Sequence, residues 1–281
     1  MTTTDDSPTP PTPTAPPLTP YVDAYEQTMR ATIALGHELS DEDWDRPTEC
    51  PGWTVRDQYA HLVGVERAVL ADPRPEHPVP DLPHMRNEFA QFTELDVDYR
   101  RDRSGPTVLA ELEETLDRRL AVLRDPTLTE ESMLLGPFGM RPGRLTLGVR
   151  VFDIWAHGED VRRATGRPAD LDSAAAGVAV RWIRRALAKV IGTDTGLPEG
   201  STVVIEVVGP QGFTEAVRVG AEGRGERLSE VPADQTVHLS MGTEAFTRRA
   251  CGRWSVEATP VQLMGDTEAG QAVLTALTIT P

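Results

Sequence analysis

The sequence predicts a multidomain protein in which an all-α helical bundle is followed by a small α+β domain. Apolar residues recur with the 3.6-residue period of amphipathic helices as far as about residue 191. After Gly196 they alternate with a period of two, which is typical of strands. The 281 residues are enough for two domains of ordinary size, each with its own core.

The first segment, residues 1–20, is rich in proline and threonine and contains two aspartates. This composition cannot bury enough apolar surface to fold, so we expect a disordered tail. The segment lacks the basic start and the apolar centre of a secretory signal. No apolar run in the chain approaches the roughly 20 residues that span a bilayer. We therefore expect a soluble, cytoplasmic protein with no membrane partner.

Helical runs separated by breaks rich in proline and glycine make up the predicted bundle, residues 21–170. The runs begin near Tyr21, Thr54, Met85, Thr107 and Thr146. Thr54 fits an N-cap, because Asp57 stands three residues later and can complete a capping box. Residues 136–143, rich in glycine and proline, are expected to form a loop. The last run ends at Gly166, which fits the left-handed residue that follows a helix.

The second predicted unit, residues 171–281, consists of a linking helix and a small α+β domain. A helix over residues 174–191, capped by Asp172 or Ser173, is expected to join the two halves of the chain. Short segments of strand and helix character follow, with strands near 203–207, 213–219, 237–241 and 261–264 and helices near 244–251 and 268–277.

Acidic residues outnumber basic ones, and the formal net charge at pH 7 is −16. Binding to nucleic acid requires a clustered basic surface, so we expect no nucleic-acid partner. The chain has only two cysteines, Cys50 and Cys251, far apart in the sequence. A disulfide framework is therefore not expected to hold this fold, and each cysteine is expected to be a buried apolar thiol.

Two histidines and one aspartate are the candidate metal ligands. Asp153 and His157 are four residues apart, so both side chains leave the same face of the predicted helix. His61 lies in an apolar stretch of the second helix and is placed to supply a third ligand. Two neutral imidazoles and one carboxylate suit zinc and leave a coordination position open, as in catalytic sites, although nickel and iron accept the same ligands. Spacing alone favours a plainer interpretation, in which Asp153 pairs with an arginine and His157 belongs to the core.

The remaining histidines are expected in loops or at the surface: His37, His77, His84 and His238. Trp53 and Trp155 are expected to fill the bundle core rather than to stack on a ligand. Asp57 could support a metal ligand, but the role of helix cap is favoured for it. Asp160 lies one turn beyond His157 and could orient a ligand or pair with an arginine.

Several stretches resemble the mycothiol-dependent maleylpyruvate isomerase family. They are CPGWTVRDQYAHL at 50–62 and FDIWAHGEDVRRATGRP at 152–168, together with the weaker C-terminal segments TRRACGRWS, VQLMGD and VLTALTITP. The resemblance covers most of residues 21–281. It implies a DinB-like four-helix bundle at the N-terminus and a sterol-carrier-like α+β domain at the C-terminus.

The resemblance also implies a site. In the family, a histidine on the second helix and a carboxylate-x3-histidine pair on the last helix hold the metal, and these positions match His61, Asp153 and His157. The isomerase that names the family has glutamate as the carboxylate. The shorter Asp153 would require the helix to approach the ion more closely, so the isomerase's substrate is not expected to carry over. The resemblance further suggests Arg249 or Arg253 from the second domain as a clamp for an anionic substrate.

The function expected from this resemblance is that of a zinc-dependent enzyme with mycothiol, a low-molecular-weight thiol, as cosubstrate. The thiolate would attack a small electrophilic molecule, and the enzyme would act as an isomerase or an S-transferase. Two other functions remain open from the residues alone. One is a non-catalytic metal-binding regulatory or small-ligand-binding protein, and the other is a carrier of apolar ligands built on the C-terminal domain.

Overall fold

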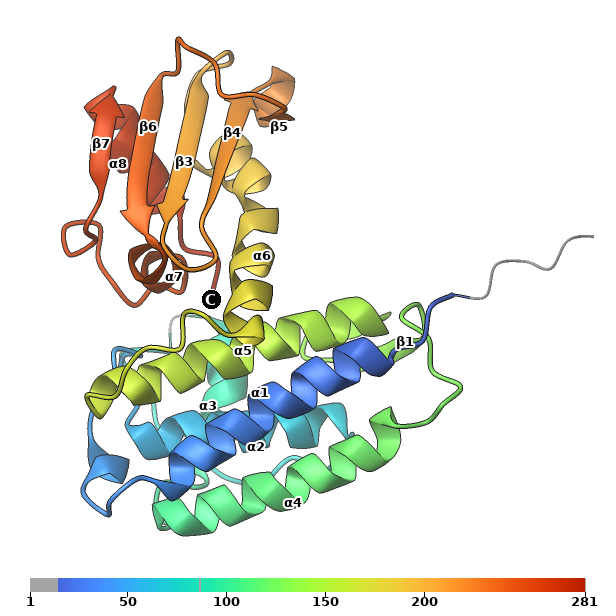
Figure 1. Ribbon diagram of the computed structural model, residues 1–281. Coiled ribbons are helices and arrows are strands. Elements are labelled where there is room, and N and C mark those ends of the chain that lie inside the picture. The colour runs from blue at the N-terminus through green and yellow to red at the C-terminus, as the bar shows by residue number, and fades with distance from the viewer. Residues whose placement is uncertain (1–14, 86, 281) are drawn as a thin grey trace, which may run out of the picture.

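The computed structural model describes residues 15–85 and 87–280, so most of the proline-rich segment lies outside the described residues. An N-terminal helical region is followed by a C-terminal region of helices and a sheet, as predicted (Figure 1). The N-terminal helices are α1 (Thr19–His37), α2 (Val55–Val69), α3 (Glu88–Asp98), α4 (Gly105–Leu123) and α5 (Gly143–Ala164). Helix α1 already begins at Thr19, and Pro17 forms an isolated bridge with Thr129, so residues just before Tyr21 are folded against the bundle.

Helices α1, α2, α4 and α5 pack on one another, and α3 lies against α2. Their apolar faces meet in a core that includes Tyr25, Met29, Tyr59, Leu112, Leu116 and Ile154. The start of α2 is fixed by the predicted capping box. The Thr54 side chain accepts from the Asp57 backbone N–H, and the Asp57 carboxylate accepts from the backbone N–H of Thr54. Because both side chains are used in this way, the beginning of the helix that carries His61 is well defined.

Between α4 and α5 the chain forms a short hairpin where we expected a loop. Strands β1 (Met133–Gly136) and β2 (Gly139–Pro142) pair antiparallel, and Gly139 has a φ of +86° in the turn. Each strand has only four residues, and glycine and proline end both of them. Such a segment has no alternating pattern that sequence analysis could use.

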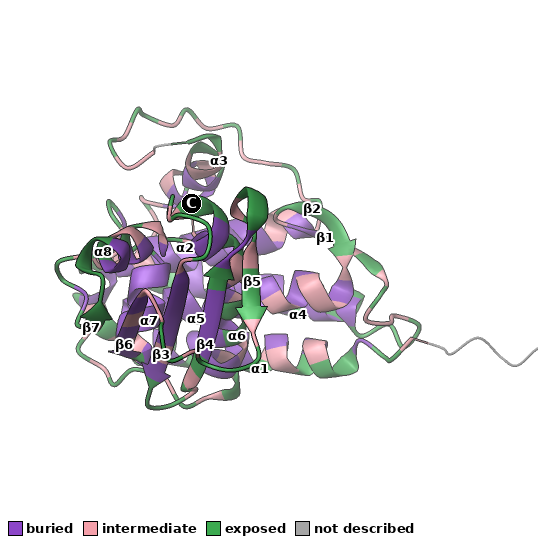
Figure 2. Cartoon of the chain, turned by 90° about the horizontal axis from the view of Figure 1, so that it is seen from above, coloured by how far each residue is buried: buried purple, intermediate pink, exposed green. Residues whose placement is uncertain are grey.

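The C-terminal domain begins with α6 (Ala174–Lys189), whose N-cap is Ser173, and a single π turn over Val190–Asp194. A five-stranded sheet follows in the order β5 (Gly225–Leu228), β4 (Phe213–Val219), β3 (Thr202–Val208), β6 (Val237–Gly242) and β7 (Gln262–Gly265). Strands β3 and β6 are parallel, and the other neighbours are antiparallel. Helices α7 (Thr243–Ala250) and α8 (Thr267–Ala276) complete the domain. The central strands are buried and the edge strands exposed (Figure 2).

Helix α5 belongs to both domains. Leu147, Val151 and Ile154 face the core of the bundle, while Phe152 and Trp155 join the core of the C-terminal domain. Because α5 packs between two domains, it is buried on nearly all of its faces. In Figure 1, α6 rises from the bundle into the second domain, and the C-terminal domain stands on α5.

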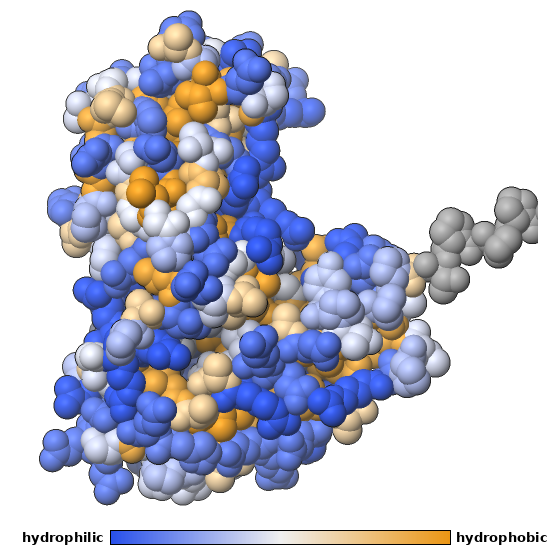
Figure 3. All heavy atoms as spheres, viewed as in Figure 1, coloured by the Kyte–Doolittle hydropathy of each residue, from blue (hydrophilic) through white to orange (hydrophobic). Residues whose placement is uncertain are grey.

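The face seen in Figure 3 is mostly hydrophilic, with hydrophobic side chains gathered in separate small areas. Within residues 15–85 and 87–280, no helix combines the length and the apolar character needed to cross a membrane.

Candidate metal centre

The structure brings the three predicted ligands together between α2 and α5. His61 Nε2 lies 3.4 Å from Asp153 Oδ2, and His157 Nε2 lies 3.6 Å from Asp153 Oδ1. One candidate ligand atom from each residue lies within 4.8 Å of the others. Both histidines are buried, while the Asp153 side chain is 27% exposed. The shorter carboxylate arm of aspartate is therefore long enough to reach both imidazoles.

The donor atoms fit a divalent metal. Ligand atoms at about 2.1 Å from one zinc ion stand about 3.4 Å apart in a tetrahedron, close to the two distances seen here. Both ring nitrogens of His61 are buried without a hydrogen-bond partner among the described residues. A buried imidazole with no partner is costly. Coordination of one of its nitrogens would remove part of that cost.

The second imidazole is oriented by Gln58. His157 Nδ1 is hydrogen-bonded to Gln58 Oε1, and because a carbonyl oxygen only accepts, Nδ1 carries the hydrogen. His157 Nε2 therefore keeps its lone pair on the side of Asp153 and His61. This is the pattern by which outer side chains set the tautomer of a histidine that binds metal.

The electrostatics of the site also favour metal-binding protonation states. Burial, assisted by His157, lowers the pKa of His61 and so favours the neutral imidazole. Burial alone would raise the pKa of Asp153, but Arg150 and the two imidazoles hold it well below its ordinary value. Arg150 Nη1 lies 2.7 Å from Asp153 Oδ2, and Arg150 Nε lies 2.8 Å from the fully buried Glu66. Asp153 thus pairs with an arginine, as the plainer interpretation required, and also belongs to the triad.

The triad lies in a pocket of about 300 Å³ that both domains line. The N-terminal domain contributes the three candidate ligands, Cys50, Trp53, His84, Phe89 and Glu94, among others, and the C-terminal domain contributes Cys251, Arg253, Thr278 and Thr280. The ring of Trp53 lies 5.1 Å from that of His61 and 5.9 Å from that of His157. Trp53 is therefore a wall of the site as well as a buried residue of the bundle. Trp155 packs in the core shared with the C-terminal domain.

The two arginines proposed as a substrate clamp have different surroundings. Arg253 lines the pocket, and its guanidinium is bound to Asp160, with Nη2 2.8 Å from Oδ2. Arg249 does not line the pocket. Its guanidinium donates to the carbonyls of Leu274 and Trp254 and ties α7 to the end of the chain.

Asp160, left open between two roles by the sequence, pairs with arginines of the C-terminal domain. Besides Arg253, it binds Arg248, whose Nη2 lies 2.7 Å from Asp160 Oδ1. Its other oxygen lies 3.6 Å from His157 Nδ1. Asp160 thus contacts both the second domain and a candidate metal ligand.

Both cysteines lie at the pocket. Burial raises the pKa of the Cys50 thiol to about 11, and it raises the pKa of the Cys251 thiol to about 11 as well. The two residues come from different domains, and the structure places both near the triad.

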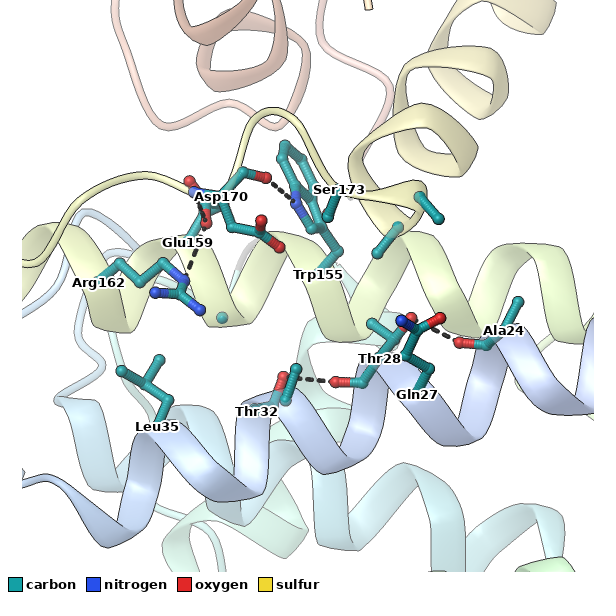
Figure 4. A pocket seen from close by; sticks show the side chains of 14 residues that line it. Ala24, Gln27, Thr28, Thr32, Leu35, Trp155, Glu159, Arg162, Asp170 and Ser173 are labelled. Atoms are coloured by element: carbon teal, nitrogen blue, oxygen red, sulfur yellow. Dashed lines mark hydrogen bonds and ion pairs between the residues drawn. The ribbon is translucent and has the colours of Figure 1, made fainter. Parts of the chain in front are cut away.

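A second, smaller hollow of about 90 Å³ lies between α1, α5 and the segment that leads to α6 (Figure 4). Trp155 and Glu159 of α5, Thr28 and Thr32 of α1, and Asp170 line it. The two threonine hydroxyls donate to carbonyls of their own helix, and the Trp155 indole donates to the Asp170 carbonyl. Its polar groups are thus largely engaged with one another, and we place the functional site at the larger pocket.

Sequence reasoning missed three residues of the site. Gln58 lies in the stretch 50–62 that resembles the family, but no role was assigned to it. Glu94 belongs to a helical segment without a recognisable motif, and His84 was placed in a loop without a role. Gln58 lies three residues before His61, so its position one turn away on the same helix was a usable signal. The contacts of Glu94 and His84 depend on how α3 packs against α2, which no local pattern gives.

Comparisons with known proteins identify the family of the N-terminal domain and the fold of the chain. A family model described as the mycothiol maleylpyruvate isomerase N-terminal domain matches residues 25–162. The crystal structure of the mycothiol-dependent maleylpyruvate isomerase aligns with a TM-score of 0.56 at 18% identity, covering 89% of this chain and 95% of the other. That of a histidine-to-alanine mutant of this isomerase aligns with a TM-score of 0.55 at 17% identity, covering 88% and 93%.

No curated protein matches the chain. At these identities the two solved structures establish only the fold, and the match to the N-terminal domain model establishes the family. Through residues 25–162, the chain belongs to the mycothiol-dependent maleylpyruvate isomerase family, and it has the two-domain fold of the solved isomerase.

Proposed function

We propose that this protein is a zinc-dependent isomerase that uses mycothiol to act on a small electrophilic molecule. The observation that carries the proposal is the His61–Asp153–His157 cluster at an interdomain pocket, with both nitrogens of His61 unpartnered among the described residues. Three ligands leave one coordination position for a small molecule, as in catalytic zinc sites. The family to which residues 25–162 belong supports a thiol as the cosubstrate.

A bound zinc ion would supply positive charge that lowers the pKa of a thiol entering the open position. The chain's own residues do the rest. His61 and His157 hold neutral imidazoles toward the site, and Arg150 fixes the carboxylate of Asp153. Trp53 and Phe152 line the pocket, and their apolar surfaces exclude water around the reacting sulfur.

The proposed reaction is reversible addition of the thiolate to the electrophile. The thiolate forms a C–S bond to a carbon–carbon double bond of the electrophile, the resulting single bond rotates, and the C–S bond breaks as the double bond re-forms. If the sulfur stays on the product, the same site is an S-transferase. Product analysis distinguishes the two. Arg253 is the candidate substrate clamp because it lines the pocket, and it would have to share its guanidinium with Asp160.

Elemental analysis of the purified protein beside His61→Ala and Asp153→Ala tests the metal site. We expect about one zinc per chain in the wild type and loss of the metal in both variants. Mycothiol-dependent turnover of maleylpyruvate and related unsaturated acids then tests the enzyme. A protein that binds zinc but converts no electrophile with any thiol would instead be a non-catalytic metal-binding protein. A wild type that cannot be loaded with zinc would refute the site.

A further inference from the structure

We propose that His84 is a catalytic acid–base residue of the pocket, held by Glu94, that takes the proton of the thiol cosubstrate. The inference rests on the function proposed above and assigns one further residue to it. His84 lies outside the metal triad, on the segment between α2 and α3, and lines the same pocket. Among the described residues that line this pocket, it is the imidazole that the triad does not use.

The ring of His84 is held in a defined tautomer. Its Nε2 lies 2.8 Å from Glu94 Oε2. A carboxylate accepts the hydrogen bond, so Nε2 carries the hydrogen and the neutral ring has its lone pair on Nδ1. No residue within 15–85 and 87–280 forms a hydrogen bond with Nδ1. The Glu94 side chain is 1% exposed, and its other oxygen pairs with Arg101. A buried carboxylate behind an imidazole is the arrangement that general bases use in other enzymes.

Gly52 makes room for this ring. A Cβ atom at position 52 would stand 2.3 Å from His84 Nδ1, and the φ of Gly52 is +79°, a conformation that side chains disfavour. Gly52 lies between Pro51 and Trp53, which both line the pocket. Cε1 and Cγ of the ring stand 2.6 and 2.9 Å from the same position, so Gly52 lies over the face of the imidazole and not in line with the Nδ1 lone pair, and glycine is the residue that leaves room for the ring at the pocket wall.

Glu94 links the proposed base to the metal site. The same oxygen, Oε2, accepts from Trp53 Nε1 at 2.8 Å, and Trp53 lies against the rings of His61 and His157. One buried carboxylate thus positions both the aromatic wall of the triad and His84. Within the described chain, Arg101 is the charged residue that contacts this pair, and Arg101 in turn lies 2.6 Å from Asp98 and 3.7 Å from Asp57.

A thiol that binds as thiolate must give up its proton, and the triad offers no free acceptor. The lone pairs of His61 and His157 belong to the metal, and Asp153 is paired with Arg150. In the proposed step the S–H bond breaks, its electron pair stays on sulfur, and an N–H bond forms at His84 Nδ1. Glu94 then faces the imidazolium. When the sulfur leaves the product, the proton returns to it.

The chain contains a matched control. His77 lies on the same segment, and its Nε2 is 2.7 Å from the carboxylate of Asp98 on α3, but His77 does not line the pocket. His84→Gln keeps an N–H that can donate to Glu94 and loses the basic nitrogen. His77→Gln makes the same chemical change outside the site. His84→Ala leaves space for added imidazole.

The experiment mixes the zinc-loaded full-length protein with mycothiol in a stopped-flow instrument and follows proton release and thiolate absorbance from pH 5 to 9. We expect zinc content to be unchanged in all variants. Thiolate formation should slow about 10²-fold in His84→Gln and lose its pH dependence, while His77→Gln behaves as the wild type. Added imidazole should restore part of the rate of His84→Ala.

Unchanged rates in His84→Gln would overturn the inference, as would loss of zinc together with failure of imidazole rescue, which would assign His84 a structural role. Failure of the proposed function has a different signature, because wild-type protein loaded with zinc would then form no thiolate with mycothiol.

Discussion

Gln58 is the side chain that fixes the orientation of His157. Its Oε1 bonds to His157 Nδ1, and its Nε2 donates to Thr48 Oγ1 at 2.8 Å, so both ends of the amide are held. Gln58 itself is fully buried. A side chain fixed at both ends can hold the imidazole ring of a ligand in one orientation before any metal arrives.

Gln58→Leu removes the acceptor for His157 Nδ1 and should weaken zinc binding about 10- to 100-fold, since supporting side chains contribute that much in other zinc sites. Gln58→Glu keeps an acceptor and should retain the wild-type affinity or exceed it. Competition with a chromogenic chelator measures both, and circular dichroism confirms that the helices are intact. Equal affinities in the leucine variant and the wild type would show that Gln58 does not orient the ring.

Helix α5 carries a buried carboxylate at its junction with the segment that leads to α6. Glu159 lies in the smaller hollow, where its Oε1 accepts from the Asp170 backbone N–H at 3.0 Å (Figure 4). Arg162 is 3.4 Å away. Burial outweighs these contacts and raises the pKa of Glu159 from 4.5 to about 7. The folded protein therefore binds a proton between pH 4.5 and 7 that the unfolded chain releases.

Because the folded state holds this extra proton, the free energy of unfolding should fall as pH rises from about 4.5 to 7. Glu159→Gln should stabilise the protein at pH 8 by up to about 3 kcal/mol, since one pKa unit corresponds to about 1.4 kcal/mol. At pH 4 the variant should gain nothing. Urea denaturation at both pH values measures the difference, with the exposed Glu222→Gln as a control. A gain that is equal at the two pH values would contradict the assigned burial cost.

At the scale of the whole molecule, a network of buried ion pairs joins the second domain to α5, the helix that carries two of the three candidate ligands. Arg248 and Arg253 bind Asp160, and Arg248 also binds Glu49 of the bundle. Burial alone would raise the pKa of Asp160, but Arg253 and Arg248 lower it below its ordinary value of 3.8. Its contribution to stability is therefore present above about pH 4 and is lost as pH falls through the lowered pKa.

Asp160→Asn leaves the buried Arg253 guanidinium without a charged partner and leaves Arg248 with Glu49 alone, and it should lower the free energy of unfolding by about 3 kcal/mol at pH 7. Arg163→Gln is the matched control, because Arg163 joins the same two domains through Glu49 and Glu244 while 44% exposed. Its loss should cost less than about 1 kcal/mol. Calorimetry and hydrogen exchange on α7 measure both. Equal effects of the two substitutions would show that the buried pair is not the fastening element.

The sequence predicted most of the helices and the triad, because periodicity and spacing are local properties. Asp153 and His157 share a helix face at a separation of four residues, and the structure shows them converging on His61. The hairpin over residues 133–142 was missed because its strands are four residues long and carry no alternation. Strand boundaries in so short a segment depend on packing against α5.

Contacts between segments that are distant along the chain could not be predicted from the sequence. The bonds of Glu94 to Trp53 and His84 join residues 41 and 10 positions apart. The choice of Asp160 as the partner of Arg253, 93 residues later, follows from domain docking. The family resemblance suggested Arg249 or Arg253 near the site, but it could not say which group would engage the guanidinium.

The two cysteine thiols that line the pocket differ from a free thiol in their reactivity. With a pKa of about 11, each of Cys50 and Cys251 is a thiolate in only about one molecule in 10⁴ at pH 7. Thiols react with electrophiles as thiolates, so these two sulfur atoms are unreactive near neutral pH. Under the proposed function, the protein would therefore keep two cysteines beside an alkylating substrate without inactivating itself, and the reaction would be left to a thiol that diffuses in and out.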